Sequence, residues 1–255
     1  MSGKYNEEKK YVMTSEVPCY DVDSNFRMRP AAFMDLAQEI AYQAATALGF
    51  GYEELQKEGK AWVLSRMHFE FLRHPLWREG IELATWHKGP YGPFYLRDFS
   101  LKSADGELLV RCTSSWVILD VVSRTMCRTA EVMEMIPENT ICHENAIEKP
   151  ADKVMMPRGI EPEAAGIHKV EFSDVDLLGH TNNARYVVWA MDCIDFDELK
   201  TRPVKDVTVT FNHETLAGEQ ISLEKVRMAS EDGTVTYFID GKAGDKSAFC
   251  VRINM

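Results

Sequence analysis

The densest group of polar side chains in this chain of 255 residues lies within one stretch of ten positions. It holds two carboxylates, one imidazole and two carboxamides, from Asp174, Asp176, His180, Asn182 and Asn183. An imidazole and a carboxylate can serve as general base or fix a water molecule. The segment is predicted to run from a loop into a helix, whose first turn offers unpaired N–H groups and a positive dipole end. Such a site can stabilise a carbonyl oxygen that becomes an oxyanion.

The same residues also fit a purely structural interpretation. Asn182 or Asn183 can cap the helix, and Asp174 and Asp176 are typical of Asx turns. His180 is then an ordinary loop histidine with satisfied hydrogen bonds. Residue types alone leave both interpretations open.

Two helices are expected around this segment and its earlier counterpart. Apolar residues recur at helical spacing from Phe33 to Leu48, with Pro30 in the first turn and Gly49 at the end. A second helix is expected to start near Asn182 and Asn183.

The remaining elements are predicted to be strands, because branched and aromatic residues alternate between turn signals. A strand-like segment at His168–Phe172 leads into the polar stretch. The Asp-Gly pairs at 105–106 and 232–233 predict hairpins. The other predicted strands cover residues 61–72, 81–87, 94–101, 108–119, 206–213, 220–228, 235–240 and 248–253.

This order of elements occurs twice, which predicts an internally duplicated α+β fold in which a sheet wraps a helix. Tyr20-Asp21-Val22-Asp23 precedes the first helix, and Ser173-Asp174-Val175-Asp176 precedes the second. We expect an N-terminal domain over residues 1–130, a proline-rich linker over 131–165 and a C-terminal domain over 166–255.

Composition limits the function. The chain is 45% hydrophobic, and its formal net charge of −11 argues against binding to nucleic acid. No apolar run approaches the roughly 20 residues that cross a bilayer. The N-terminus has no apolar core of a secretory signal, and the six cysteines are scattered without a CxxC pair. We therefore expect a cytoplasmic protein without a membrane span, a disulfide framework or a zinc site.

Several ordered segments together make the chain resemble the acyl-acyl carrier protein (ACP) thioesterase family. They span both predicted domains: Asp21-Val22-Asp23, Trp62-Val63-Leu64-Ser65-Arg66, Pro75-Leu76-Trp77-Arg78-Glu79-Gly80, Arg97-Asp98-Phe99, Ser114-Ser115-Trp116-Val117, Ser173-Asp174-Val175-Asp176, Gly179-His180 and Asn182-Asn183. The resemblance implies two tandem hot-dog folds, each an antiparallel sheet wrapped around a long central helix. It also implies hydrolysis of fatty acyl-ACP thioesters to free fatty acid and holo-ACP, which terminates chain elongation.

The family's loop motif, Asp-x-Asn-x-His, places its Asp on Asp176 and its His on His180, but Leu178 stands where the family has Asn. A later family Glu falls on Glu214. The following position, a cysteine in many plant members, is Thr215, so a cysteine nucleophile is not supported here.

The resemblance implies a water-based mechanism without metal or cofactor. Glu214 is the expected base or water-positioning carboxylate, and His180 hydrogen-bonds the thioester oxygen or shares the water. Asp176 orients His180 or supports the loop. Backbone N–H groups near Asn182 and Asn183 stabilise the oxyanion.

The first domain carries Arg27 where the second has His180, so one active site is expected, with the first domain as acyl-chain pocket and scaffold. The candidate pocket residues, which an ordinary core also explains, are Phe33, Met34, Trp62, Met67, Phe69 and Phe71.

Two other functions stay open. The substrate can be an acyl-CoA instead of a fatty acyl chain on acyl carrier protein. Alternatively, Leu178 is consistent with a non-hydrolytic protein that only binds acyl thioesters. The chain is expected to be a monomer with an intramolecular hot-dog pair or a homodimer.

Overall fold

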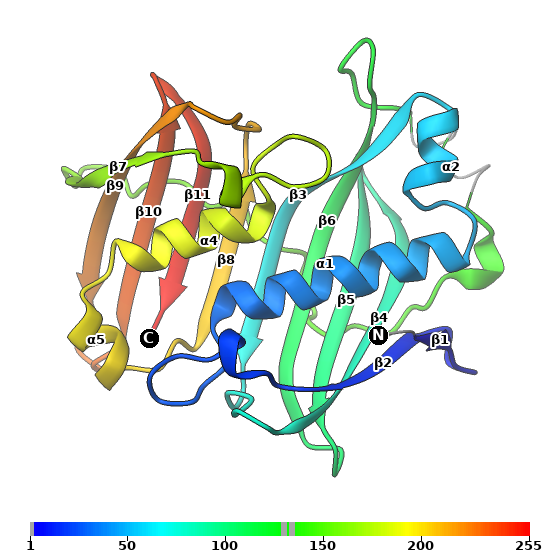
Figure 1. Cartoon of the computed structure of the whole chain (residues 1–255), viewed down its shortest axis with the longest axis horizontal. Coiled ribbons are helices and arrows are strands. Elements are labelled where there is room, and N and C mark those ends of the chain that lie inside the picture. Colours follow the sequence, from blue (N-terminus) through cyan, green and yellow to red (C-terminus); the bar gives the residue numbers. More distant parts are fainter. Residues whose placement is uncertain (1–2, 129–131, 133–135) are drawn as a thin grey trace. The chain divides into compact units, whose positions relative to one another are not determined.

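The chain, seen in a computed structural model that describes residues 3–128, 132 and 136–255, divides into two compact units (Figure 1). The first unit comprises residues 1–29 and 35–151, and the second comprises 30–34 and 152–255. The boundary predicted at residue 130 lies outside the described residues.

The first unit is an antiparallel sheet with few helices. Its strands follow the order β1-β2-β4-β5-β6-β3, and each neighbouring pair is antiparallel. Its elements are β1 (Lys4–Tyr5), β2 (Tyr11–Glu16), η1 (Cys19–Asp21), α1 (Pro30–Ala47, from residue 35 on), α2 (Tyr52–Lys57), β3 (Lys60–Phe71), β4 (Gly80–Tyr91), β5 (Phe94–Ser103), β6 (Leu108–Asp120) and η2 (Glu138–Thr140).

The predicted first helix is confirmed as α1, which crosses the strands β4, β5 and β6 (Figure 1). It begins at Pro30, whose fixed φ suits the first turn, and it ends before Gly49, which adopts a φ of 79°. Ala45 near its C-terminal end packs with Phe50 and Tyr95 in a buried cluster. The helix therefore covers one face of the sheet because its apolar stripe needs burial.

The second unit repeats the plan on a smaller scale. Its strands follow the order β8-β11-β10-β9-β7, again antiparallel throughout. Its elements are β7 (Glu163–Lys169), η3 (Phe172–Asp174), α4 (Asn183–Asp192), α5 (Phe196–Thr201), β8 (Asp206–Phe211), β9 (Gln220–Ala229), β10 (Val235–Ala243) and β11 (Lys246–Asn254).

The predicted second helix is confirmed as α4, with ten residues against the 18 of α1. Its buried side includes Tyr186 and Trp189, and the ring of Tyr186 lies 4.8 Å from that of Phe249 on β11. Both Asp-Gly hairpins are also confirmed, since Gly106 and Gly233 adopt φ values of 90° and 84° between paired strands.

The strand predicted at His168–Phe172 is wrong in its position. β7 covers Glu163–Lys169, and Phe172 lies in the short helix η3. The pairing of β7 with β9 sets the strand, including an irregularity between Ala164 and Gly166, and that partner is distant in sequence.

The segment predicted as a linker is anchored to both units. In the first unit, the backbone N–H of Cys142 donates to His87 O (3.0 Å), and that of Ala146 donates to Asp98 Oδ2 (2.8 Å). In the second unit, Val154 N–H donates to Thr210 Oγ1 (2.8 Å). The chain between the predicted domains therefore forms part of the packing.

Among the described residues, no helix is long and apolar enough to cross a membrane.

Candidate active site

A tight turn in front of α4 presents His180. The N–H of Asp176 donates to His180 O (2.9 Å), and the N–H of Gly179 donates to Asp176 O (3.0 Å). Gly179 takes a φ of 81°, a left-handed conformation that glycine adopts without steric cost. Asp176 Oδ1 accepts from the N–H of Leu178 (2.8 Å). Asp176 thus holds the shape of the loop from within.

The structure brings His180 close to Glu214, as the family resemblance implies. The backbone N–H of Thr181 donates to Thr215 O (2.9 Å), which joins the two segments directly behind the pair. His180 Nε2 lies 3.5 Å from Glu214 Oε2, and the two side chains are 33% and 39% exposed. An imidazole and a carboxylate at this separation, both open to solvent, can share one water molecule.

The two asparagines occupy the start of α4. Asn182 is the N-cap, because its Oδ1 accepts from Ala184 N–H (2.8 Å). Its backbone N–H donates to Asp174 O (2.8 Å). Asn183 is the first residue of the helix. The capping interpretation is therefore confirmed for Asn182.

Asp174 stabilises the start of the loop and contacts His168, a histidine that the sequence analysis did not identify. Its carboxylate is nearly buried and accepts from His168 Nε2 (2.8 Å) and from Glu171 N–H (2.8 Å). Burial alone would raise the pKa of Asp174, but these hydrogen bonds outweigh it and lower that pKa. The ring of His168 contacts that of Trp189 of α4 in a tilted arrangement, with the ring centroids 4.2 Å apart. No spacing pattern marks His168, since its partner is defined only by the fold.

The first unit contains a counterpart of this loop, 153 residues earlier, built on the same backbone bonds. The N–H of Asp23 donates to Arg27 O (2.8 Å), as that of Asp176 does to His180 O. The N–H of Arg29 donates to Asp21 O (2.9 Å), as that of Asn182 does to Asp174 O.

A second loop is also repeated, 140 residues apart. Leu76 N–H donates to Glu79 Oε2 at 2.8 Å, and Leu216 N–H donates to Glu219 Oε2 at 2.9 Å. Met28 N–H donates to Pro75 O (2.8 Å), which matches the bond from Thr181 to Thr215.

The side chains at the counterpart positions are different. Arg27 replaces His180 and forms an ion pair with Asp23 (Nη2 to Oδ2, 2.8 Å). His74 replaces Glu214 and stacks at 4.2 Å on Phe71. The first unit therefore has the loop framework with an arginine and a histidine in place of the imidazole–carboxylate pair.

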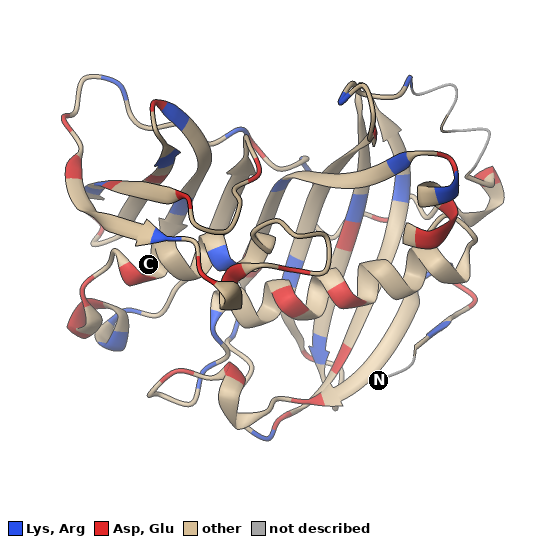
Figure 2. Cartoon of the chain, turned by 45° about the horizontal axis from the view of Figure 1, so that its top comes forward, with Lys and Arg blue, Asp and Glu red and all other residues tan. Residues whose placement is uncertain are grey.

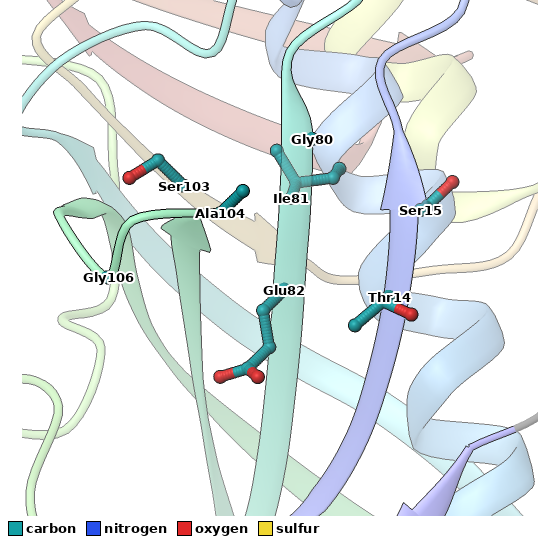
Figure 3. A pocket seen from close by; sticks show the side chains of 8 residues that line it. All are labelled: Thr14, Ser15, Gly80, Ile81, Glu82, Ser103, Ala104 and Gly106. Atoms are coloured by element: carbon teal, nitrogen blue, oxygen red, sulfur yellow. The ribbon is translucent and has the colours of Figure 1, made fainter.

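A pocket of about 320 Å³ lies in the first unit, beside β2, β4 and the β5–β6 hairpin (Figure 3). It holds none of the predicted site residues. Its lining is mostly small or polar, which suits a fatty chain poorly, and consists of Thr14, Ser15, Gly80, Ile81, Glu82, Ser103, Ala104 and Gly106.

The side chains predicted to line an acyl pocket are buried, except Trp62, which is half-buried. In the described part of the chain, no group of three His, Cys, Asp or Glu residues has the arrangement of a metal site.

Comparison with known proteins decides the family. The model of the acyl-ACP thioesterase N-terminal domain matches residues 8–136, and that of the C-terminal domain matches residues 161–252. The chain belongs to the acyl-ACP thioesterase family. The resemblance found in the sequence is thereby confirmed.

Individual members of the acyl-ACP thioesterase family show the extent of the match. Oleoyl-acyl carrier protein thioesterase 2 of Arabidopsis thaliana is 27% identical over 84% of this chain and 61% of its own length. The oleoyl-acyl carrier protein thioesterase of Coriandrum sativum is 25% identical over 88% and 64%. The chain thus spans about three fifths of the length of these curated relatives.

Solved structures support the hot-dog-like fold of the family. A putative oleoyl thioesterase of Lactobacillus plantarum superposes with a TM-score of 0.83 at 23% identity, covering 96% of this chain and 95% of its own. The 12:0-ACP thioesterase of Umbellularia californica gives a TM-score of 0.84 at 19% identity, with 96% and 93% covered. At these identities the likeness concerns the fold alone.

Proposed function

We propose that this chain hydrolyses fatty acyl-ACP thioesters to free fatty acid and holo-ACP, ending fatty-acid elongation. Membership of the family supports the reaction class. The observation that carries the proposal is the partly exposed pair of His180 and Glu214, whose side chains approach to 3.5 Å from segments far apart in sequence.

Water is the weak reactant in this reaction, whereas the thiol leaving group, with an ordinary pKa near 8.5, departs with little protonation. Glu214 takes a proton from the water, whose oxygen attacks the thioester carbonyl carbon. His180 holds that water or the carbonyl oxygen. The C–S bond then breaks, and the thiolate leaves as holo-ACP.

The surrounding residues shape the site. Asp176 keeps the turn that presents His180, through its bond to Leu178 N–H. The N–H groups of Asn182, Ala184 and Arg185 are bound within the chain. The oxyanion is therefore stabilised by the positive dipole end of α4, which begins at Asn183.

We further propose that the two units are tandem hot-dog folds, each wrapped around its helix, with α1 and α4 as the central helices. The repeated backbone bonds in the loops before α1 and α4 support this proposal. The N-terminal domain (1–130), joined through residues 131–165 to the catalytic domain (166–255), supplies the acyl-chain pocket and scaffold. Depth of that pocket then sets chain-length preference, at about 0.8 kcal/mol per buried CH₂.

ACP is the proposed carrier of the acyl chain. Figure 2 shows basic and acidic residues interspersed along both units, an arrangement that does not favour an acidic carrier protein over the phosphates of CoA. Acyl-ACP and acyl-CoA of equal chain length are therefore assayed side by side with a thiol-detecting reagent. Faster thiol release from acyl-ACP is expected, and a preference for acyl-CoA would reassign the carrier.

Substitution of the pair tests the chemistry. His180→Ala and Glu214→Ala should each lower kcat by about a hundredfold, the usual scale of general-base effects. Glu231→Ala, in the exposed β9–β10 turn, is the matched control and should leave kcat unchanged. Near-wild-type turnover by either site variant would remove its assigned role. Absence of thiol release from both carriers would indicate a non-hydrolytic binding protein.

A further inference from the structure

Three buried hydroxyl groups adjoin the His180–Glu214 pair. Thr181, Thr215 and Tyr186 are 5%, 0% and 2% exposed. The Oγ1 atoms of Thr181 and Thr215 are 2.7 Å apart, and Tyr186 Oη lies 3.0 Å from Thr215 Oγ1. We call these three residues the hydroxyl cluster.

One assignment of protons satisfies every hydroxyl in the cluster. Tyr186 donates to Thr215 Oγ1, Thr215 donates to Thr181 Oγ1, and Thr181 donates to Thr215 O (3.2 Å). Tyr186 Oη in turn accepts from the backbone N–H of Thr215 (3.1 Å). A buried polar network in which each donor is used is rigid, since breaking one bond leaves an unsatisfied buried group.

The cluster acts on the backbone directly behind the pair. Thr181 follows His180 and Thr215 follows Glu214, and Tyr186 ties Thr215 to α4. Thr215 itself is fully buried and its hydroxyl lies 2.7 Å from that of Thr181, so it is not placed to attack a substrate.

The first unit shows that the fold of these loops does not need the hydroxyls. The positions of Thr181 and Thr215 are taken there by Met28 and Pro75, yet the backbone bond between them remains, at 2.8 Å. The position of Tyr186, fourth in its helix, is taken by Phe33, fourth in α1. The hydroxyls therefore accompany the imidazole–carboxylate pair and are missing where Arg27 and His74 replace it.

We propose that Thr181, Thr215 and Tyr186 are positioning residues that set the separation of His180 and Glu214 for hydrolysis. This inference rests on the proposed function. A small misplacement of catalytic groups costs up to about 10² in rate, so loss of one cluster bond should lower kcat about tenfold.

Thr215→Val and Tyr186→Phe test the proposal, because each removes a hydroxyl and keeps the packing shape. Both variants should lower kcat about tenfold while KM stays within about twofold of the wild-type value. Thr215→Ser keeps the hydroxyl and should therefore have the wild-type kcat. Thr208→Val is the matched control, since Thr208 is also fully buried on β8 and accepts from Arg252 Nη2 (3.0 Å). Thr208→Val should lower the free energy of unfolding about as much as Thr215→Val does, but kcat should not change. Tyr186→Phe gives the answer if Thr215→Val does not fold.

A double variant of His180 and Thr215 tests the positioning role separately from the proposed function on which it rests. In a His180→Ala background, Thr215→Val should cause no further loss, because there is no pair left to position. Unchanged kcat in both hydroxyl variants, or the same drop in Thr208→Val, would overturn the positioning role. A full rate in His180→Ala alone would instead overturn the proposed function.

Discussion

Leu178 stands where the resemblance to the family implies an asparagine, and the structure shows how the loop is held with a leucine there. Leu178 is 46% exposed, and its backbone N–H donates to Asp176 Oδ1. The turn is thus held by backbone atoms and by Asp176, so the side chain at 178 is free to vary without loss of the loop.

Leu178→Asn should therefore keep the fold and add an amide that can hold water or the thioester oxygen. We expect kcat to rise about tenfold, which is below the 10²–10³ of an optimally placed oxyanion donor. Thiol release under saturating substrate measures it. Leu177→Asn, at an adjacent and more exposed position, is the control. An equal effect of both substitutions, or none from Leu178→Asn, would mean that the missing amide is irrelevant here.

Among the elements, the segment after β6 is held in the first unit by a buried histidine. His87 is on β4, and its Nε2 lies 2.8 Å from Thr140 Oγ1. The backbone carbonyl of His87 accepts from Cys142 N–H. Burial, together with the positive charge of Arg97, lowers the pKa of His87 from its ordinary 6.5 to about 4. His87 is therefore neutral in the folded protein at pH 7.

This lowered pKa predicts that the contact of His87 with the segment around Thr140 and Cys142 becomes less stable in acid. Between pH 6.5 and about 4 the unfolded chain binds a proton at His87 that the folded chain does not, so the free energy of unfolding falls as pH falls. The contribution of His87 to that loss should be about 3 kcal/mol. In urea unfolding at pH 7.5 and pH 4.5, the free energy of unfolding of His87→Gln should fall less between the two pH values than that of the wild type. His143→Gln, an exposed histidine nearby, should retain the wild-type loss, and an identical loss in all three proteins would contradict this role of His87.

Elements that depend on local signals were predictable. Helical spacing bounded by Pro30 and Gly49 defined α1, and the Asp-Gly pairs defined two hairpins. Elements that depend on distant partners were not: β7 is set by β9, and the linker is fixed by His87 and Thr210.

The candidate site follows the same division. Asp176 and His180 stand out as a local cluster, whereas Glu214 was assigned only through the family resemblance, since an isolated strand-end glutamate carries no signal of its own. His168 and the hydroxyl cluster went unnoticed because their bonds to Asp174, or to one another, exist only in the folded chain.

At the scale of the whole molecule, the same loop framework occurs in both units, and the proposed catalytic pair of His180 and Glu214 lies in the second. The backbone bonds of the turn occur in both units, including left-handed residues at equivalent places, Phe26 (φ 63°) and Gly179 (φ 81°). The side chains on this repeated geometry differ: in the first loop Arg27 forms an ion pair with Asp23.

Arg27→Ala tests whether the first loop is only structural. Its ion pair with Asp23 is partly exposed, so its loss should lower the free energy of unfolding by about 1 kcal/mol. Because the proposed function places catalysis at His180 and Glu214 in the second unit, kcat should stay within about twofold of wild type, in contrast to the hundredfold loss expected of His180→Ala. Urea unfolding and thiol release on the same preparations measure both quantities. A drop in kcat comparable with that of His180→Ala, at full folding, would show that the first loop takes part in the chemistry and that the two units do not divide the work as proposed.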